Sequence, residues 1–312
     1  MKYRKLGNTD LNLSAVTFGS FAIGGWLWGG TEQNTAVEAI QASYDLGVTS
    51  IDTAPVYGQG LSENIVGNAI KYIPRDKVQI LTKFGMRWDL AKGTFALNSK
   101  DGSGKDIDIY KYAGIDLYQL HWPDITTPIE ETMEAVSELI KQGKVRYAGV
   151  CNYNEAQMTE AEKYIDLASN QVPYSMVLRD IEEKIVPYSL ENGKGILAYS
   201  PLERGLLTGK MKPGYKFGEG DQRATRAFYK DENLKRTNEF LDKIKPIADE
   251  KGITLAQLVI LWTLEQPGVS VTLVGARNAE QAIQNAKSSD QDLSDKEVEI
   301  IDMHLNQLVL VP

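Results

Sequence analysis

The chain has 312 residues and a formal net charge of −8. This acidic balance, with no long basic run, excludes the broad basic face that phosphate backbones require, so we expect neither a nucleic acid nor an anionic membrane as a partner. One cysteine and two histidines exclude an internal disulfide and are too few for the common structural zinc sites, so we predict no metal. The N-terminus lacks the apolar region of a secretory signal and no apolar run could span a membrane, which indicates a soluble, cytoplasmic protein.

Strand-like and helical patterns alternate along the chain. Residues 2–14 predict a polar hairpin that turns at Gly7 and Asn8. Buried strands are then expected over residues 15–20, 48–54, 78–85, 116–122, 145–152, 169–176, 195–202 and 270–277. Helices are expected over residues 34–47, 62–73 (capped by Ser62), 128–144, 155–165, 181–193, 233–252, 254–268, 278–289 and 294–308.

This alternation predicts the fold class. Strands separated by amphipathic helices indicate a parallel sheet covered by helices, and eight such strands favour closure into a (β/α)8 TIM barrel over an open sheet. We therefore expect one α/β domain over residues 1–312, with an N-terminal hairpin and extra C-terminal helices. Residues 24–30 are glycine-rich but lack the G-x-G-x-x-G spacing, so a Rossmann dinucleotide site gets little support.

Four polar side chains stand where predicted strands end. Asp52 and Tyr57 follow the second barrel strand, Lys83 ends the third, and His121 ends the fourth. Each alone has an ordinary structural explanation, such as a turn, packing or solvation. Because the C-terminal ends of the strands of a barrel meet on one face, we expect these four groups to lie together.

The chemistry of these four groups is complementary. A phenol titrates near ~10 and is a poor acid at neutral pH, but a nearby ammonium favours the phenolate and eases proton donation. Lys83 would supply that charge, Asp52 would hold the lysine charged and aimed at Tyr57, and His121 would hydrogen-bond a carbonyl oxygen. This set suits the protonation of an oxygen while a hydride reaches its carbon.

The motifs around these residues resemble those of the aldo-keto reductases. IDTAPVYG, LTKFG, DLYQLHWPD, GKVRYAGVCN, AYSPLERGLLTGK and VGARNAEQAIQNA occur in the family's order over nearly the whole chain. The nearest group is that of the bacterial reductases that resemble general stress proteins and share ancestry with potassium-channel beta subunits. The resemblance implies a barrel that binds extended NADPH without a Rossmann motif, with Asp52, Tyr57, Lys83 and His121 as the catalytic tetrad and Tyr57 as proton donor.

The same motifs imply the cofactor residues. Asn152 and Gln171 would hold the nicotinamide carboxamide, with Cys151 beside them, and Tyr199 would stack on the ring. Arg277, always charged and forked, favours NADPH over NADH. The remaining positions implied are Gly19 and Thr53 at the near end, Ser200, Pro201, Leu202, Arg204 and Gly205 along the pyrophosphate, Gly275 at the N-terminus of the last barrel helix, and Gln281 and Asn285 at the adenine end.

Two departures from the family pattern stand out. Cys151 replaces the usual serine before Asn152, and a thiol is a weaker hydrogen-bond partner, so looser carboxamide binding and simple small-residue packing are both open. Residues 84–115 contain five glycines and no helical stripe where the family has an amphipathic helix, so the third barrel helix is apparently missing. A true deletion, a truncated chain and numbering that runs through an absent segment are all open; we favour the last two, since a bare barrel flank would be costly.

The substrate is less well specified. Trp26, Trp28, Trp88 and Trp122 are candidates for an aromatic substrate pocket suited to small aldehydes and ketones, whereas Trp262 is expected in the core. The polar stretch 203–230 either folds over the cofactor or is simply solvated. The oligomeric state, monomer or homo-oligomer, is left open.

Three functions compete. We predict NADPH-dependent reduction of aldehydes and ketones; the alternative is an NADPH-binding regulatory subunit with little turnover. A third, an isomerase or aldolase that uses Lys83 as a Schiff base, is disfavoured because a charged lysine is a poor nucleophile.

Overall fold

The protein is described here by a computed structural model, in which residues 1–25, 32–89, 94–97, 114–218 and 221–311 are described. Eight parallel strands close a barrel in the order β3-β4-β5-β8-β9-β10-β11-β12. This arrangement confirms the predicted barrel. The strands are β3 (Val16–Gly19), β4 (Ser50–Asp52), β5 (Gln79–Phe84), β8 (Ile115–Leu120), β9 (Val145–Cys151), β10 (Leu167–Pro173), β11 (Gly195–Tyr199) and β12 (Val269–Val274).

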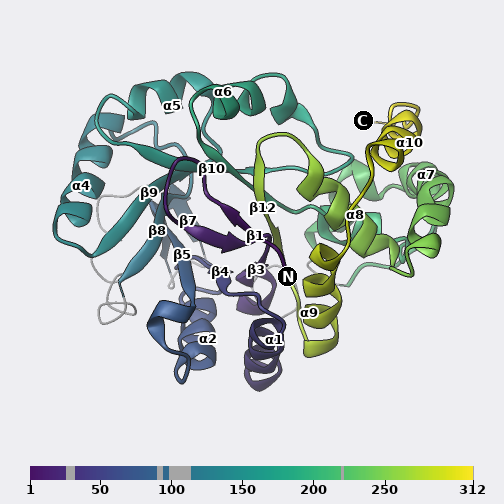
Figure 1. The fold of residues 1–312 in the computed structure, drawn as a ribbon, viewed down its shortest axis with the longest axis horizontal. Coiled ribbons are helices and arrows are strands. Elements are labelled where there is room, and N and C mark those ends of the chain that lie inside the picture. The colour runs from purple at the N-terminus through teal and green to yellow at the C-terminus, as the bar shows by residue number, and fades with distance from the viewer. Residues whose placement is uncertain (26–31, 90–93, 98–113, 219–220, 312) are drawn as a thin grey trace.

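Helices surround the barrel in a ring (Figure 1). The apolar side chains of their inner faces pack against the outward side chains of the strands, which are buried on both faces as parallel strands usually are. No helix in the described ranges is long and apolar enough to cross a bilayer. The helices are α1 (Gln33–Asp45), α2 (Leu61–Ile70), α4 (Ile129–Lys141), α5 (Glu155–Ala161), α6 (Ile185–Glu191), α7 (Asp231–Glu250), α8 (Leu255–Glu265), α9 (Ala279–Ala286) and α10 (Asp295–Leu305).

The N-terminal hairpin closes one end of the barrel. Strands β1 (Tyr3–Lys5) and β2 (Asn12–Ser14) pair antiparallel, and Figure 1 shows the hairpin lying across the ring. Leu6, Leu11 and Leu13 are buried against inward side chains of the barrel strands, including Leu81 and Leu117. This end is therefore filled by leucines, and polar chemistry is left to the other end.

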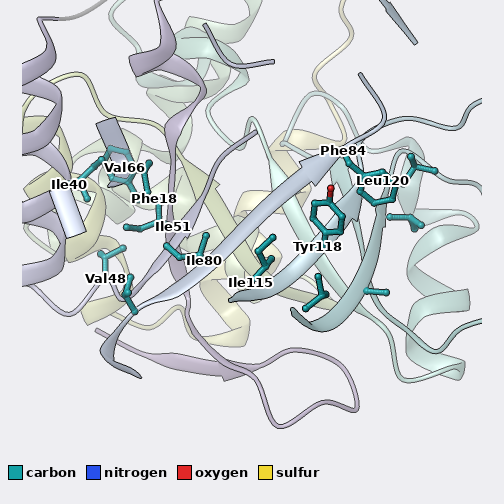
Figure 2. Packing of buried hydrophobic residues seen from close by; sticks show 14 of the residues in the cluster. Phe18, Ile40, Val48, Ile51, Val66, Ile80, Phe84, Ile115, Tyr118 and Leu120 are labelled. Atoms are coloured by element: carbon teal, nitrogen blue, oxygen red, sulfur yellow. The ribbon is translucent and has the colours of Figure 1, made fainter. Parts of the chain in front are cut away.

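The outer core is continuous from α1 and α2 to the flank of β5 and β8. Figure 2 shows Phe84, Tyr118 and Leu120 packed together at that flank, and the Phe84 and Tyr118 rings stack with centroids 4.5 Å apart. Trp262 of α8 is fully buried and donates to Asp302 Oδ1 at 2.9 Å, which confirms its predicted place in the core.

The connection from β5 to β8 is the part of the barrel that departs from a plain strand-helix repeat. It begins with an antiparallel hairpin of β6 (Met86–Asp89) and β7 (Thr94–Leu97), which the sequence analysis did not predict. Residues 98–113, on which the missing third helix falls, lie outside the described residues, so that part of the prediction stays a prediction. The chain returns at Gly114, whose carbonyl accepts from Arg75 at 3.0 Å.

One predicted cap is wrong. Helix α2 begins at Leu61 with Gly60 as its N-cap, at a φ of 91°, and Ser62 lies inside the helix. The Ser62 hydroxyl instead bonds the Ser20 hydroxyl at 2.7 Å and lies 3.1 Å from the Thr53 hydroxyl. The Ser62 side chain therefore makes a tertiary hydrogen bond in the core instead of capping the helix, as local rules predicted.

Candidate active site

The four predicted catalytic residues lie at the C-terminal end of neighbouring barrel strands. Asp52 ends β4, Lys83 lies on β5 and His121 directly follows β8. Leu81 and Lys83 both point into the barrel, as do Leu117 and, by strand alternation, His121. The strand order of the barrel therefore brings an acid, an ammonium and an imidazole to one point.

Asp52 and Lys83 form a buried ion pair. Lys83 Nζ lies 2.6 Å from Asp52 Oδ1 and also donates to the Thr53 carbonyl at 2.9 Å. Lys83 is 0% exposed and Asp52 2%. Burial, the largest single influence, disfavours the lysine charge, but Asp52, Tyr57 and Cys151 together outweigh it, so the pKa of Lys83 lies above its ordinary value. The lysine is a fixed cation here.

The second carboxylate oxygen of Asp52 is held by two amides. Gln171 Nε2 of β10 donates to Asp52 Oδ2 at 2.9 Å, and Gln119 Nε2 of β8 lies 3.4 Å from the same atom. Both glutamines are buried. Asp52 therefore has partners on both carboxylate oxygens, Lys83 on Oδ1 and the two amides on Oδ2.

Tyr57 is placed by a tight backbone contact. A Cβ at Gly58 would lie 2.0 Å from the Gly24 carbonyl oxygen, and a Cβ at Gly24 would lie 2.7 Å from the Tyr57 carbonyl carbon. Only glycine at both positions lets the turn after β4 meet the segment after β3. This contact explains the glycine-flanked turn and fixes the backbone that carries the phenol.

The Tyr57 ring contacts both the lysine and the histidine. Lys83 Nζ lies 4.8 Å from its centroid, and the His121 ring crosses it edge to face at 5.7 Å. Phe21 packs on it at 5.0 Å. Burial raises the pKa of Tyr57 to about 12, although the Lys83 charge acts to lower it. From the sequence, Lys83 was expected to dominate the pKa of Tyr57 and to lower it. Burial instead has the larger effect, so the phenol keeps its proton at neutral pH.

His121 is a neutral imidazole. Burial, assisted by the nearby Lys83 charge, holds its pKa well below the ordinary value. Its backbone is fixed, since its N–H donates to the Phe84 carbonyl at 2.9 Å and its carbonyl accepts from Asn152 Nδ2 at 3.2 Å. Its Nδ1 is buried without a hydrogen-bond partner among the described residues. A buried ring nitrogen of this kind is available to donate a hydrogen bond to a ligand or to accept one from it.

Asn152 and Tyr199 form the next part of the site. The Tyr199 hydroxyl donates to Asn152 Oδ1 at 3.0 Å, and Asn152 has a φ of 59°. Cys151 is buried directly before it, and burial raises the pKa of its thiol, so it is an unreactive small residue in this setting. Asn152 and Gln171 are joined through the backbone, Asn152 N–H to Gln171 carbonyl, at 3.0 Å.

Backbone strain gathers at this end of the barrel. Among the described residues, every non-glycine residue with a positive φ follows a barrel strand on this face. Such conformations persist where the surrounding structure enforces them and are common around ligand sites. These residues are Gln59, Asn152, Ser200, Glu203 and Arg204.

The loop after β11 is tied to the polar stretch 203–230. The Arg223 guanidinium donates to the Arg204 carbonyl at 3.0 Å, and the Tyr229 hydroxyl donates to the Glu203 carbonyl at 2.9 Å. Arg223, and in addition Arg277, holds the pKa of Asp221 below its usual range. The stretch therefore reaches from the β11 loop toward the N-terminus of α9. The predicted Ser200, Pro201 and Leu202 directly precede the stretch, and Arg204 and Gly205 lie at its start.

The predicted adenine-end residues lie around the start of α9. Asn278 caps this helix by accepting from Gln281 N–H at 2.9 Å. Gln281 Oε1 accepts from Arg277 N–H at 3.0 Å, and Asn285 Nδ2 donates to the Gly275 carbonyl at 3.1 Å. A Cβ at Gly275 would lie 3.3 Å from the Gly19 carbonyl oxygen. Gly19, predicted at the near end of the cofactor, and Gly275, predicted at the N-terminus of the last barrel helix, thus lie next to each other across β3 and β12.

The predicted aromatic pocket is only partly described. Trp26 and Trp28 lie outside the described residues, and Trp88 is described only as backbone of β6. Trp122 follows His121 and is 40% exposed. An exposed indole next to His121 in sequence suits a substrate contact. Of the four predicted tryptophans, Trp122 is the one whose side chain lies within the described residues.

Gln119 is the site residue that the sequence analysis missed. It lies two residues before His121 in DLYQLHW, on the inward side of a strand whose other inward residue, Leu117, is apolar. A polar residue in the inward register of a buried strand was the available signal.

This chain is similar to known proteins in both sequence and structure. The family model described as "Aldo/keto reductase family" matches residues 15–306. The aldo-keto reductase YhdN of Bacillus subtilis is 38% identical over 286 residues, covering 90% of this chain and 86% of that protein. The NADH-specific methylglyoxal reductase of Escherichia coli is 33% identical over 325 residues, covering 96% and 97%.

Two further matches extend the comparison. A probable voltage-gated potassium channel subunit beta of Arabidopsis thaliana is 33% identical over 307 residues, covering 93% of this chain and 92% of that protein. Among solved structures, the glycerol dehydrogenase AKR11B4 from Gluconobacter oxydans is similar with a TM-score of 0.87 at 33% identity, covering 99% of this chain and 97% of that one.

Proposed function

Because this chain belongs to the aldo/keto reductase family, an oxidoreductase family that acts on carbonyl groups, we propose that it reduces aldehydes and ketones to alcohols with NADPH, and that Tyr57 is the proton donor. One observation carries the assignment of roles: the Tyr57 ring contacts both the fixed Lys83 cation and the neutral His121 imidazole. A phenol in contact with an ammonium and an imidazole suits the protonation of a carbonyl oxygen.

Each of these residues has a distinct task. The Tyr57 phenol, with a pKa raised to about 12, holds its proton until a substrate oxygen gains negative charge. The Lys83 ammonium then stabilises the phenolate that forms, and Asp52 keeps that ammonium charged and directed. His121 stays neutral and orients the substrate oxygen by a hydrogen bond. The same fixed charge makes Lys83 a poor Schiff-base nucleophile, which argues against an aldolase or isomerase.

The residues present fit a nicotinamide dinucleotide. Asn152 and Gln171 offer amides at the ends of β9 and β10, the strained loop after β11 carries Ser200 and Arg204, and Arg277 precedes α9. When bound, NADPH supplies the hydride. Arg277 supports NADPH through a forked cation suited to phosphate. The NADH-specific relative makes NADH the alternative cofactor to test.

Turnover with a panel of small aldehydes tests the proposal. We expect wild type to oxidise NADPH in the presence of substrate, and Tyr57→Phe to lose about 10²–10⁴-fold in kcat, the usual contribution of one acid catalyst. NADPH binding, followed by fluorescence titration, is expected to survive in the variant. Parallel titrations with NADH rank the two cofactors.

The same experiment distinguishes the proposed function from its alternatives. If wild type binds NADPH tightly but turns over no carbonyl, the protein is a cofactor-binding regulatory subunit, a possibility favoured by its likeness to a channel subunit beta. If Tyr57→Phe keeps the wild-type kcat, another group donates the proton. Circular dichroism of the variant separates either result from a folding defect.

A further inference from the structure

We propose that Gln119 is a positioning residue of this site: it fixes the direction of the Gln171 side-chain amide, so that Gln171 presents its carbonyl oxygen to the cofactor carboxamide. The inference rests on the proposed function. Gln119 itself touches neither substrate nor cofactor in this scheme and acts through Gln171 and Asp52.

The placement of Gln119 is unusual for a barrel interior. Its side chain is 0% exposed, at a level of the barrel where bulky aliphatic residues normally fill the space. A buried amide is costly unless its donors and acceptor are hydrogen-bonded. The neighbouring Gly149 of β9 makes room for it, since a Cβ there would lie 3.1 Å from Gln119 Cγ. The chain thus keeps space for an amide where a leucine would pack.

The hydrogen bonds around Gln171 leave it a single orientation. Its Nε2 donates to Asp52 Oδ2 at 2.9 Å and to Gln119 Oε1 at 3.3 Å. An amide nitrogen has two hydrogens, so both are used. The reverse orientation would place the Gln171 carbonyl oxygen against an ionised carboxylate, which can only accept. Gln171 Oε1 is therefore the atom left for a ligand.

Gln119 completes this arrangement, and Asp52 alone does not. Asp52 accounts for one of the two Gln171 hydrogens, and the other needs an acceptor at the position of Gln119 Oε1. Gln119 is itself oriented, because its Nε2 lies 3.4 Å from Asp52 Oδ2 and its Oε1 lies 4.0 Å from the Cys151 thiol. Without Gln119, only the Asp52 carboxylate orients the Gln171 amide, and the amide turns more widely about its terminal torsion, which is broad.

A cofactor analogue gives the proposal a specific test. In an NADPH analogue whose carboxamide is replaced by an acetyl group, the carbonyl remains but the NH₂ that would donate to Gln171 Oε1 is lost. Wild type should bind NADPH more tightly than the analogue, by about 10-fold for one net hydrogen bond. In Gln119→Leu, which has a similar volume, this preference should fall to about two-fold or less. Fluorescence titration measures both dissociation constants.

Controls separate this outcome from a general loss of structure. Gln142→Leu removes an exposed amide at the end of α4 and should leave the preference at its wild-type value. Gln119→Met provides a second variant if Gln119→Leu fails to fold, and thermal unfolding reports the fold of each. If folded Gln119 variants keep the full preference for NADPH over the analogue, the inference is wrong while the proposed function stands. If wild type binds no nicotinamide cofactor, both are overturned.

Discussion

The two ends of the barrel each bury a carboxylate, and they satisfy it in opposite ways. At the N-terminal end Asp116 is 3% exposed and pairs with Arg75 at 2.6 Å and Arg146 at 3.0 Å, both partly open to solvent, and accepts from the Ile80 N–H at 2.9 Å. At the C-terminal end Asp52 pairs with Lys83, which no solvent reaches. The first pair lies at the rim, and the second lies in the interior.

The two ends of the barrel therefore have different roles. Around Asp116 the charge is balanced by two arginines that stay partly hydrated. Around Asp52 the charge is balanced by one buried lysine, next to a phenol and to an imidazole whose Nδ1 has no hydrogen-bond partner in the described part of the chain. A fixed charge that is shielded from solvent stabilises charge developing during a reaction more strongly than a hydrated charge does. The predictions below test this contrast.

Breaking the interior pair should have the largest effect. Lys83→Met leaves Asp52 buried without its cation, which we expect to lower the free energy of unfolding by about 3–5 kcal/mol. Catalytic turnover should be lost as well, because the phenolate loses its stabilising charge. Chemical denaturation and NADPH oxidation measure the two effects.

A double variant separates stability from activity at this pair. Asp52→Asn combined with Lys83→Met removes both charges and should recover most of the lost stability, since the uncompensated charge is gone. Activity should stay absent. A double variant no more stable than Lys83→Met would show that the loss came from packing, and the contrast between the two ends would lose its electrostatic basis.

The rim pair should matter for stability only. Asp116→Asn removes the charge that joins Arg75 and Arg146 and weakens the bond to the Ile80 N–H, so we expect a loss of about 1–3 kcal/mol in the free energy of unfolding. The arginines stay partly solvated, which keeps the cost below that at Lys83. kcat and the NADPH dissociation constant should be unchanged. A fall in kcat comparable to that of Lys83→Met would mean that the two ends are coupled.

Much of this contrast could be predicted from the sequence. The alternation of strands and helices predicted the barrel, and strand ends alone brought Asp52, Lys83 and His121 to one face. The residues that were missed act through tertiary contacts. Ser62 resembled a helix cap, but it bonds Ser20 across the core, and Gln119 gained its meaning only once β4, β8 and β10 were placed around one carboxylate.

The balance between burial and neighbouring charge that sets the pKa of Tyr57 could not be predicted from the sequence either. Proximity to Lys83 predicted a more acidic Tyr57, but whether a neighbouring charge or burial wins depends on how much solvent the fold removes. The hairpin of β6 and β7 carries no strong turn pair between its strands, and it lies within a glycine-rich stretch where local patterns indicate neither strand nor helix. Local rules therefore located the site and left its energetics undetermined.

The smallest predicted effect is a pH dependence of stability that arises at the C-terminal end. The pKa of His121 is lowered in the folded state, so the unfolded chain binds a proton more readily. The resulting stabilisation is fully present above the unfolded value of about 6.5 and is lost as the pH falls below it, at up to about 1.4 kcal/mol per pH unit. Denaturation of wild type between pH 7 and pH 5 should show this slope over and above the carboxylate contribution.

His121→Gln, which is neutral throughout, should remove that part of the slope, and the difference between the two curves isolates the histidine. His304→Gln removes the only other histidine of the chain and leaves His121 in place, so its curve should keep the extra slope. If His121→Gln follows wild type at every pH, the imidazole titrates as freely in the folded protein as in the unfolded chain. It would then be protonated in mild acid, and its proposed role as a neutral hydrogen-bonding partner of the substrate oxygen would be confined to higher pH.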